Sequence, residues 1–201
     1  MSRKDDIINA AVILFAENGY SATSTSAVAK KAGVAEGLIF HHFKNKVGIL
    51  ICIFTELSEV YRHEVEKIFK KAETGLDALL TVVRFHFEFA ENQSKKFKVL
   101  LRDFPSELAA SKSKAGNIVI DHISNTLNQI KKCIKRGLED GSIRDVPLEE
   151  TAYIIRGMLT GISRFKISMP GVLINPDIYL EVESFCRRSL SQQDHVNLYG
   201  N

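Results

Sequence analysis

The sequence predicts an all-α fold, and three observations support this prediction. Apolar residues recur at helical intervals of three and four along most of the 201-residue chain. Glycines suited to ending helices follow several of these stretches, as at Gly19, Gly33 and Gly141. No segment keeps the strict alternation of apolar and polar residues that is typical of a half-buried strand.

The first predicted helix runs from about Lys4 to Asn18 and ends at Gly19. Its apolar stripe consists of Ile7, Ala11, Leu14 and Phe15. We expect this helix to brace the two helices that follow it into a three-helix domain.

The next two helices lie between Thr25 and Lys46 and are short. The hydroxyl of Ser24 or Thr25 can cap the first of them, and Gly33 supplies the positive φ that a tight interhelical turn needs. The inward residues are predicted to be Val28, Ala29, Ala32, Val34, Ile39 and Phe43. The pattern leaves Glu36, Gly37, Leu38, Phe40 and His41 pointing outward. Two short helices joined in this way predict a helix-turn-helix, whose usual partner is double-stranded DNA.

The long segment after Asn45 predicts a helix from about Lys46 to Lys71 that leaves the N-terminal domain. Further helices are expected at about 76–92, 95–103 and 115–139, with a loop at 111–114. The helix at 76–92 carries two adjacent apolar stripes, which predicts contacts on more than one side. We therefore expect residues 1–46 to form one domain and residues 47–201 another.

The last two helices are expected to begin at Pro147 and near Asn175-Pro176. The former has one apolar face for its own core and a second that is free for a partner, and the latter has an apolar stripe as well. Two such helices from each subunit would form a four-helix interface of two-fold symmetry. The predicted interface residues are Ile154, Met158, Gly161, Phe165, Ile178, Val182 and Phe185. The alternative is that these faces are ordinary core.

Composition is consistent with a globular intracellular protein. The net charge is only +3, but basic residues gather near the helix-turn-helix, at Arg3, Lys4, Lys30, Lys31, Lys44 and Lys46. The three cysteines have no paired spacing, which favours a reducing cytoplasm and argues against disulfides and zinc. No signal peptide is recognisable, and no apolar run approaches the roughly 18 residues of a membrane span. We expect no metal and no cofactor, because no ligand cluster or Gly-rich phosphate loop is present.

The residues 32–46, with Glu17-Asn18-Gly19-Tyr20 before them, closely resemble the N-terminal signature of the TetR/AcrR family of bacterial transcriptional regulators. The resemblance covers about the first quarter of the chain. It implies a homodimeric repressor that is released from a palindromic operator by a small effector. The chain departs from the family at Ala35, Leu38 and Phe40, where hydroxyl or polar groups are usual, so it lacks the hydroxyls that commonly contact phosphates at these positions.

By this resemblance Glu36, Gly37 and Phe40 face bases, and Ser26 reaches another base. Glu36 could accept a hydrogen bond from cytosine, and Phe40 could pack on a thymine methyl group. The positions that match backbone contacts are Thr25, Leu38, His42 and Lys46, and His41 completes the predicted interface. The alternative for Glu36 is a solvated acid that interacts with the helix dipole.

The resemblance also implies an effector pocket inside the C-terminal domain. Its candidate lining is Val82, His86, Phe89, Arg102, Phe104, Tyr153 and Met158. Such a lining suits a lipophilic molecule, such as one like an acyl-CoA or a drug-like aromatic compound. Ordinary core packing is an equal alternative for each residue.

Two other function classes remain. One is a helical small-molecule sensor or carrier with a vestigial DNA domain, a reading that the missing hydroxyls allow. The other is an enzyme on a helical scaffold, which is disfavoured because the sequence shows no clustered acid, base or metal ligands.

Overall fold

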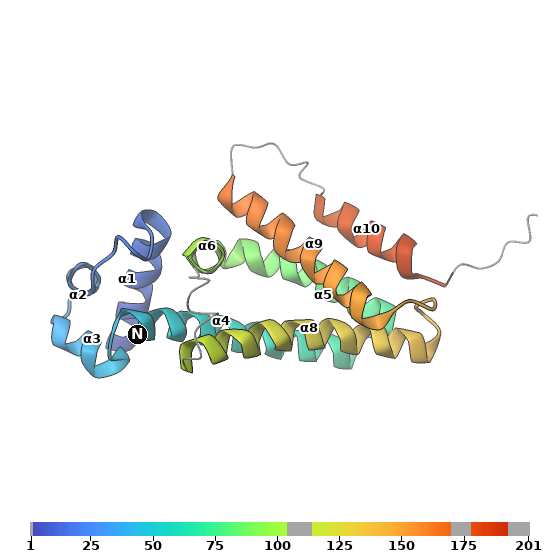
Figure 1. Cartoon of the computed structure of the whole chain (residues 1–201), viewed down its shortest axis with the longest axis horizontal. Helices are drawn as coiled ribbons and strands as arrows, with labels where there is room; N and C mark the ends of the chain where they lie inside the picture. The colour runs from blue at the N-terminus through green and yellow to red at the C-terminus, as the bar shows by residue number, and fades with distance from the viewer. Residues whose placement is uncertain (1, 104–113, 170–177, 193–201) are drawn as a thin grey trace, which may run out of the picture.

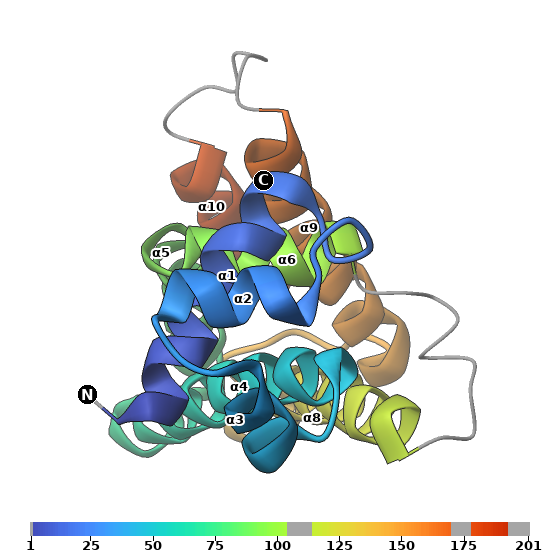
Figure 2. The same cartoon turned by 90° about the vertical axis from the view of Figure 1, so that its left-hand side faces the viewer.

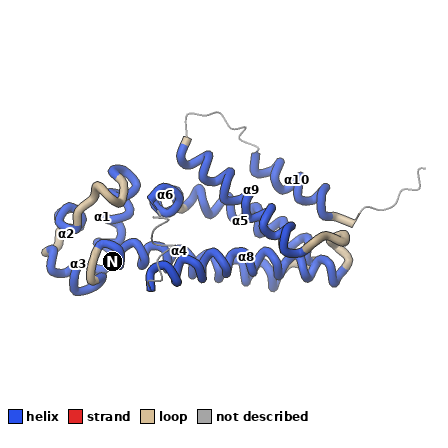
Figure 3. The backbone as a smooth tube through the Cα atoms, viewed as in Figure 1, coloured by secondary structure: helices blue, strands red, loops and turns tan. Residues whose placement is uncertain are grey.

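The computed structural model describes residues 2–103, 114–169 and 178–192, and within them the chain is helical (Figures 1 and 3). The all-α prediction is confirmed. The helices are α1 (Arg3–Asn18), α2 (Thr25–Ala32), α3 (Glu36–Phe43), α4 (Lys46–Lys71), α5 (Gly75–Asn92), α6 (Ser94–Asp103), α8 (Lys114–Asp140), α9 (Leu148–Ser168) and α10 (Ile178–Leu190).

Helices α1 to α3 form a small layer at one end of the molecule, and α4 leads from it into the larger helical part (Figures 1 and 2). The apolar centre of this layer is called the N-terminal core. It contains Ile7, Ala11, Phe15, Val28, Ile39, Phe43, Ile49, Leu50, Ile53 and Val99, together with smaller neighbours. The core therefore includes the first turns of α4 and one residue of α6, so it extends past residue 46.

The turns of this layer follow from local chemistry. Ser24 caps α2 by accepting a hydrogen bond from the backbone N–H of Ala27, as predicted. Gly33 adopts φ 66° and ψ 36°, the left-handed conformation that the turn between α2 and α3 requires. Asn45 caps α4 through a bond of 2.9 Å from the N–H of Gly48 to Oδ1.

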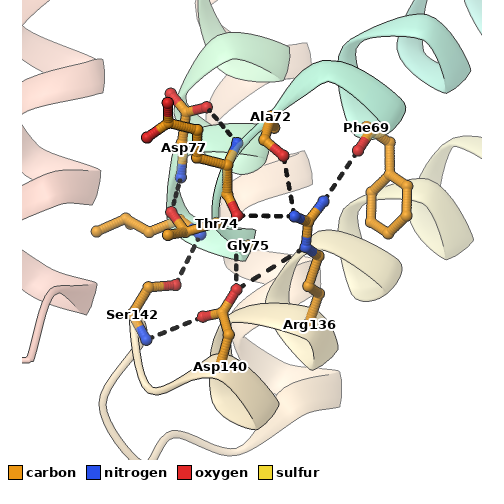
Figure 4. A network of polar contacts seen from close by, with 10 residues as sticks. Phe69, Ala72, Thr74, Gly75, Asp77, Arg136, Asp140 and Ser142 are labelled. Carbon is orange, nitrogen blue, oxygen red and sulfur yellow. Dashed lines mark hydrogen bonds and ion pairs between the residues drawn. The ribbon is translucent and has the colours of Figure 1, made fainter.

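The corner between α4 and α5 is fixed by side chains from the end of α8 (Figure 4). Arg136 donates hydrogen bonds to the carbonyls of Phe69, Ala72 and Glu73, which satisfies acceptors at the end of α4. Asp140 accepts from the N–H of Gly75 at 2.7 Å. Backbone groups at the end of α4 and the start of α5 that have no partner within their own helix are thus hydrogen-bonded by side chains of α8.

The larger part has its own apolar centre, the C-terminal core, to which α4, α5, α8, α9 and α10 contribute. Both predicted stripes of α5 are buried: Leu76, Leu80, Val83, Phe87 and Ala90 on one, and Leu79, Val82, His86 and Phe89 on the other. This confirms that α5 has contacts on more than one side. Helix α6 joins the two cores, because Phe97 and Leu100 pack against the C-terminal core while Val99 is fully buried in the N-terminal one.

Most predicted helix limits agree with the structure to within one residue, and the limits of Lys46–Lys71 agree fully. Pro147 was expected to be the first helical residue of α9 but stands at the N-cap, one position earlier. The predicted loop at 111–114 falls mostly outside the described residues, as does the Asn175-Pro176 start of the last helix.

Within the described residues, no single helix has both the length and the apolar character needed to cross a membrane. The pair α3 and α4 meets these criteria only when the two are joined across a bend of 58°. The same part of the chain contains no group of three or more His, Cys, Asp or Glu side chains arranged to hold a metal ion.

Candidate functional site

The outer surface of α3 is the first candidate site. Ile39 and Phe43 point into the N-terminal core, while Glu36, Gly37, Phe40, His41 and His42 are exposed. The Phe40 ring is 51% exposed, which is high for a phenylalanine on a helix with a buried face. Lys30, Lys31 and Lys44 are also exposed, and they are close to α3 in the sequence.

Leu38 was expected to point outward with these residues, but it does so only in part. The side chain is half-buried and packs against the N-terminal core.

Gly37 is a glycine that the fold itself does not require. A Cβ built at this position meets no atom within 4 Å, and its backbone is not in the left-handed region. Glycine inside a helix is about 1 kcal/mol less favourable than alanine. Close approach of a second molecule to this surface would explain a glycine at this position, because a side chain would stand in its way.

Thr25 and Glu36, which were predicted as separate DNA contacts, are hydrogen-bonded to each other. The Thr25 hydroxyl donates to Oε1 of Glu36 at 2.7 Å and so links the first turns of α2 and α3. The hydroxyl of Ser26 lies 2.9 Å from that of Ser24 and is exposed. Glu36 is therefore neither a free solvated acid nor only a dipole partner in this structure.

Lys46 also differs from its expected role as a phosphate ligand. Its ammonium group donates to the backbone carbonyls of Tyr20, Ser21 and Thr23 at 2.9, 3.4 and 3.0 Å. It also lies 4.4 Å from the centre of the Tyr20 ring. Because an ammonium has three hydrogens to donate, these carbonyls use its whole capacity. Lys46 therefore braces the connection between α1 and α2 against α4.

Replacing Lys46 by methionine is expected to lower the free energy of unfolding by about 1–3 kcal/mol, since three charge-assisted hydrogen bonds are lost. Urea denaturation measures this effect. Lys30→Met, on the exposed side of α2, is the matched control and should leave stability unchanged. Equal stability of both variants would contradict the bracing role of Lys46 and return it to the set of phosphate ligands.

The predicted pocket lining does not form one pocket. Val82, His86 and Phe89 are buried in the C-terminal core, and Met158 is half-buried against it. Tyr153 is 62% exposed and faces away from the core, so its assignment to a pocket was wrong. The family resemblance suggested it as a lining residue, but its position on α9 directs the side chain outward. Phe104 and the side chain of Arg102 lie outside the described part.

His86 has a defined polar partner inside this core. Its Nδ1 lies 3.2 Å from the hydroxyl of Tyr61, and the rings of Phe85, Phe89 and Phe97 surround the pair. Burial lowers the pKa of His86 to about 4, because an imidazolium would be poorly solvated there. The side chain is therefore neutral at pH 7. This agrees with the alternative that His86 is an ordinary part of the core.

This shift predicts a pH-dependent stability. Between pH 6.5 and about 4 the unfolded chain binds a proton on His86 that the folded chain does not, so the free energy of unfolding falls as the pH falls. The contribution of this group is on the order of 3 kcal/mol. Urea denaturation from pH 4 to 7 should show a shallower dependence in the variant Tyr61→Phe with His86→Leu. An unchanged dependence would contradict the prediction.

Three cavities among the described residues lie elsewhere, and sequence reasoning missed them, while a fourth includes Phe89 but no other predicted lining residue. Two adjoining grooves between α4 and α8 share Arg62, Asn125 and Gln129 and have many polar lining residues. Another cavity lies among the end of α5, α6, α9 and α10. No periodicity marks such places, because each draws its residues from helices that are distant in the sequence.

The predicted dimer residues divide into three groups: exposed, half-buried and buried. Ile154 and Phe165 on α9 and Phe185 on α10 are 60%, 40% and 49% exposed. Gly161 is exposed too, and a Cβ there would meet nothing within 4 Å. Val182 is 6% exposed and belongs to the C-terminal core, so its assignment to an interface is wrong for this structure. Ile178 and Met158 are half-buried.

Comparison with known proteins agrees with the helix-turn-helix geometry. The family model described as bacterial regulatory proteins, tetR family, matches residues 7–52. The fatty acid metabolism regulator protein of Bacillus subtilis is 32% identical over 139 residues, which cover 69% of this chain and 70% of the relative. The HTH-type transcriptional regulator AcrR of Shigella flexneri is 26% identical over 167 residues, covering 79% and 75%.

A solved structure extends the likeness over most of the chain. The transcriptional regulator FadR from Bacillus subtilis, in complex with stearoyl-CoA, superposes with a TM-score of 0.79 at 25% identity, and the match covers 92% of this chain and 98% of that one. The matched proteins are regulators, which supports a non-enzymatic role at the level of the family. The N-terminal match, the relative at 32% identity and the shared fold lead to one conclusion: the chain belongs to the TetR family of bacterial transcriptional regulators.

Proposed function

We propose that this regulator is a homodimeric repressor that binds a palindromic operator and is released from it by an acyl-CoA. The observation that carries the DNA-binding part is the exposed surface of α3, where Phe40 is half-exposed and Gly37 leaves room for close approach. In this scheme residues 1–46 contact DNA, and residues 47–201 bind the effector and form the dimer.

The proposed base contacts are Ser26, Glu36, Gly37 and Phe40, with His41 beside them. Thr25, Leu38 and His42 are assigned to the DNA backbone. In the DNA-free chain Glu36 is bonded to Thr25, so binding a base through Glu36 requires either that this bond is shared or that it breaks. Lys46 supports the interface by holding the loop before α2.

The dimer is proposed to form through α9 and α10, which lie on the same side of the molecule (Figures 1 and 2). Six of the eight large apolar side chains that are exposed among the described residues lie on these helices or directly after α9: Tyr153, Ile154, Phe165, Met169, Leu180 and Phe185. Such a concentration of exposed apolar area is typical of an interface. Two-fold symmetry then places two α3 helices at half-sites about 34 Å apart, or a multiple of that.

The acyl-CoA class is proposed from the relatives, of which one is named for fatty acid metabolism and one was solved with stearoyl-CoA. The effector acts by favouring a conformer in which α4 moves and the two α3 helices no longer fit successive grooves. If the effector prefers the DNA-free form a hundredfold, it weakens operator binding by about 2.7 kcal/mol and no more.

The function is tested by selecting bound duplexes from a random DNA pool and following the affinity of the winner against salt. The expected result is a palindrome bound with a steep salt dependence. Weak binding without a preferred sequence would overturn the DNA-binding proposal and favour a sensor with a vestigial DNA domain. Stearoyl-CoA is then titrated with and without operator, and equal affinities would exclude coupling.

A further inference from the structure

A cavity of about 300 Å³ lies where the end of α5, the start of α6, the second half of α9 and the start of α10 meet. We call it the α6 cavity. Its apolar wall is formed by Ala90, Ile167 and the ring of Tyr179, and it is also lined by Lys95, Lys98 and Ser163. The volume is at the low end for ligand pockets, so the cavity suits one part of a large ligand.

Ser163 gives this cavity an unused polar group. The residue is 2% exposed, and its Oγ is buried without a hydrogen-bond partner among the described residues. A buried hydroxyl in that state is unfavourable for the folded chain, and buried polar groups are normally paired. A ligand atom that accepts a hydrogen bond inside the cavity would remove this penalty.

Two lysines give the cavity a positive rim. Lys95 and Lys98 are three residues apart on α6 and so lie on one side of it. Neither forms an ion pair with a residue of the described part. The third lysine, Lys166, is already paired with Glu91 and lies 4.2 Å from the centre of the Tyr179 ring. The unpaired charge at the rim is therefore positive and favours an anionic group.

The helix that carries these lysines also reaches the N-terminal core. Val99, one residue after Lys98, is fully buried there beside α1. A molecule in the α6 cavity thus contacts a helix that packs directly against the helix-turn-helix domain. Among the described residues, those that line the grooves between α4 and α8 include none of α6 and no buried side chain that lacks a partner.

From these contacts we infer that the α6 cavity binds the acyl end of the effector. The acyl group lies against Ala90, Ile167 and Tyr179, the Ser163 hydroxyl donates to the thioester carbonyl, and the phosphates of the CoA face Lys95 and Lys98. This assignment rests on the proposed acyl-CoA function. Apolar packing, one hydrogen bond and two charges together distinguish an acyl-CoA from a neutral lipid or a simple anion.

The test is calorimetric titration of the full chain with hexanoyl-CoA and stearoyl-CoA. In the variant Lys95→Gln with Lys98→Gln, affinity for the tighter ligand should fall at least tenfold, because charge-assisted contacts to phosphate are lost. In Ser163→Ala, which removes the hydroxyl and adds no atom, affinity should fall about tenfold, while the thermal stability of the ligand-free chain stays equal or rises. Lys70→Gln with Lys71→Gln, at the far end of α4, is the matched control and should bind normally.

The outcomes separate the two proposals. If the unmodified chain binds neither thioester, the acyl-CoA function is wrong. If it binds one of them and both cavity variants bind within twofold of the control, the α6 cavity is the wrong site and the function stands. Equal affinity for CoA without an acyl group would also overturn the assignment, because the acyl end would then contribute nothing.

Discussion

Replacing Gly48 by alanine is expected to destabilise the chain by about 3 kcal/mol and to abolish operator binding. A Cβ at this position would lie 1.9 Å from the carbonyl oxygen of Phe43 and 2.9 Å from its carbonyl carbon. Both are backbone atoms, so no side-chain rotation relieves the clash. Helix α4 would therefore have to move away from the end of α3.

Gly37→Ala is the matched control for this prediction. Both glycines are helical, but a methyl group at Gly37 meets nothing within 4 Å. The control should therefore be more stable than the unmodified chain by up to about 1 kcal/mol. Urea denaturation compares the two variants. The same stability for both would contradict the steric argument. Weaker operator binding by the stable Gly37→Ala would place that residue against the DNA.

The second large effect is expected from charges on the outer face of α9. Ile154→Glu with Phe165→Glu should convert the proposed dimer to monomers and weaken operator binding at least a hundredfold, because a monomer binds one half-site and loses the contacts of the second subunit. The two side chains are 60% and 40% exposed, so the changes should not disturb the C-terminal core. Sedimentation analysis gives the oligomeric state, and a DNA titration gives the affinity.

Val60→Glu is the control for this experiment, because Val60 is an apolar residue of α4 with 52% exposure. It should remain dimeric and bind the operator as the unmodified chain does. A dimer that survives the α9 changes would show that the subunits meet through another surface.

The sequence predicted the helices well because their ends are set by nearby residues. Asn45 and Gly33 cap or break a helix through contacts within a few positions, so the pattern around them is sufficient. The inward faces of α1, α3 and α5 were predictable for a similar reason, since each stripe is long and regular.

The site residues were harder to predict because their roles depend on distant segments. Lys46 bonds carbonyls more than twenty residues away, and nothing around it in the sequence indicates that its charge is used there. Val182 shows the same limit for packing. Periodicity identifies an apolar face, but which face meets the core depends on how the helices are placed.

The position of Val99 limits how this regulator can be divided into modules. This residue comes from α6, yet it fills space among the side chains of α1 and α4. A chimera that joins residues 1–52 to the effector region of another family member would lack this valine unless the new helix supplies an equivalent. Exchange of DNA specificities between relatives therefore requires either that α6 be transferred with the helix-turn-helix or that the recipient's own helix supply an equivalent of Val99.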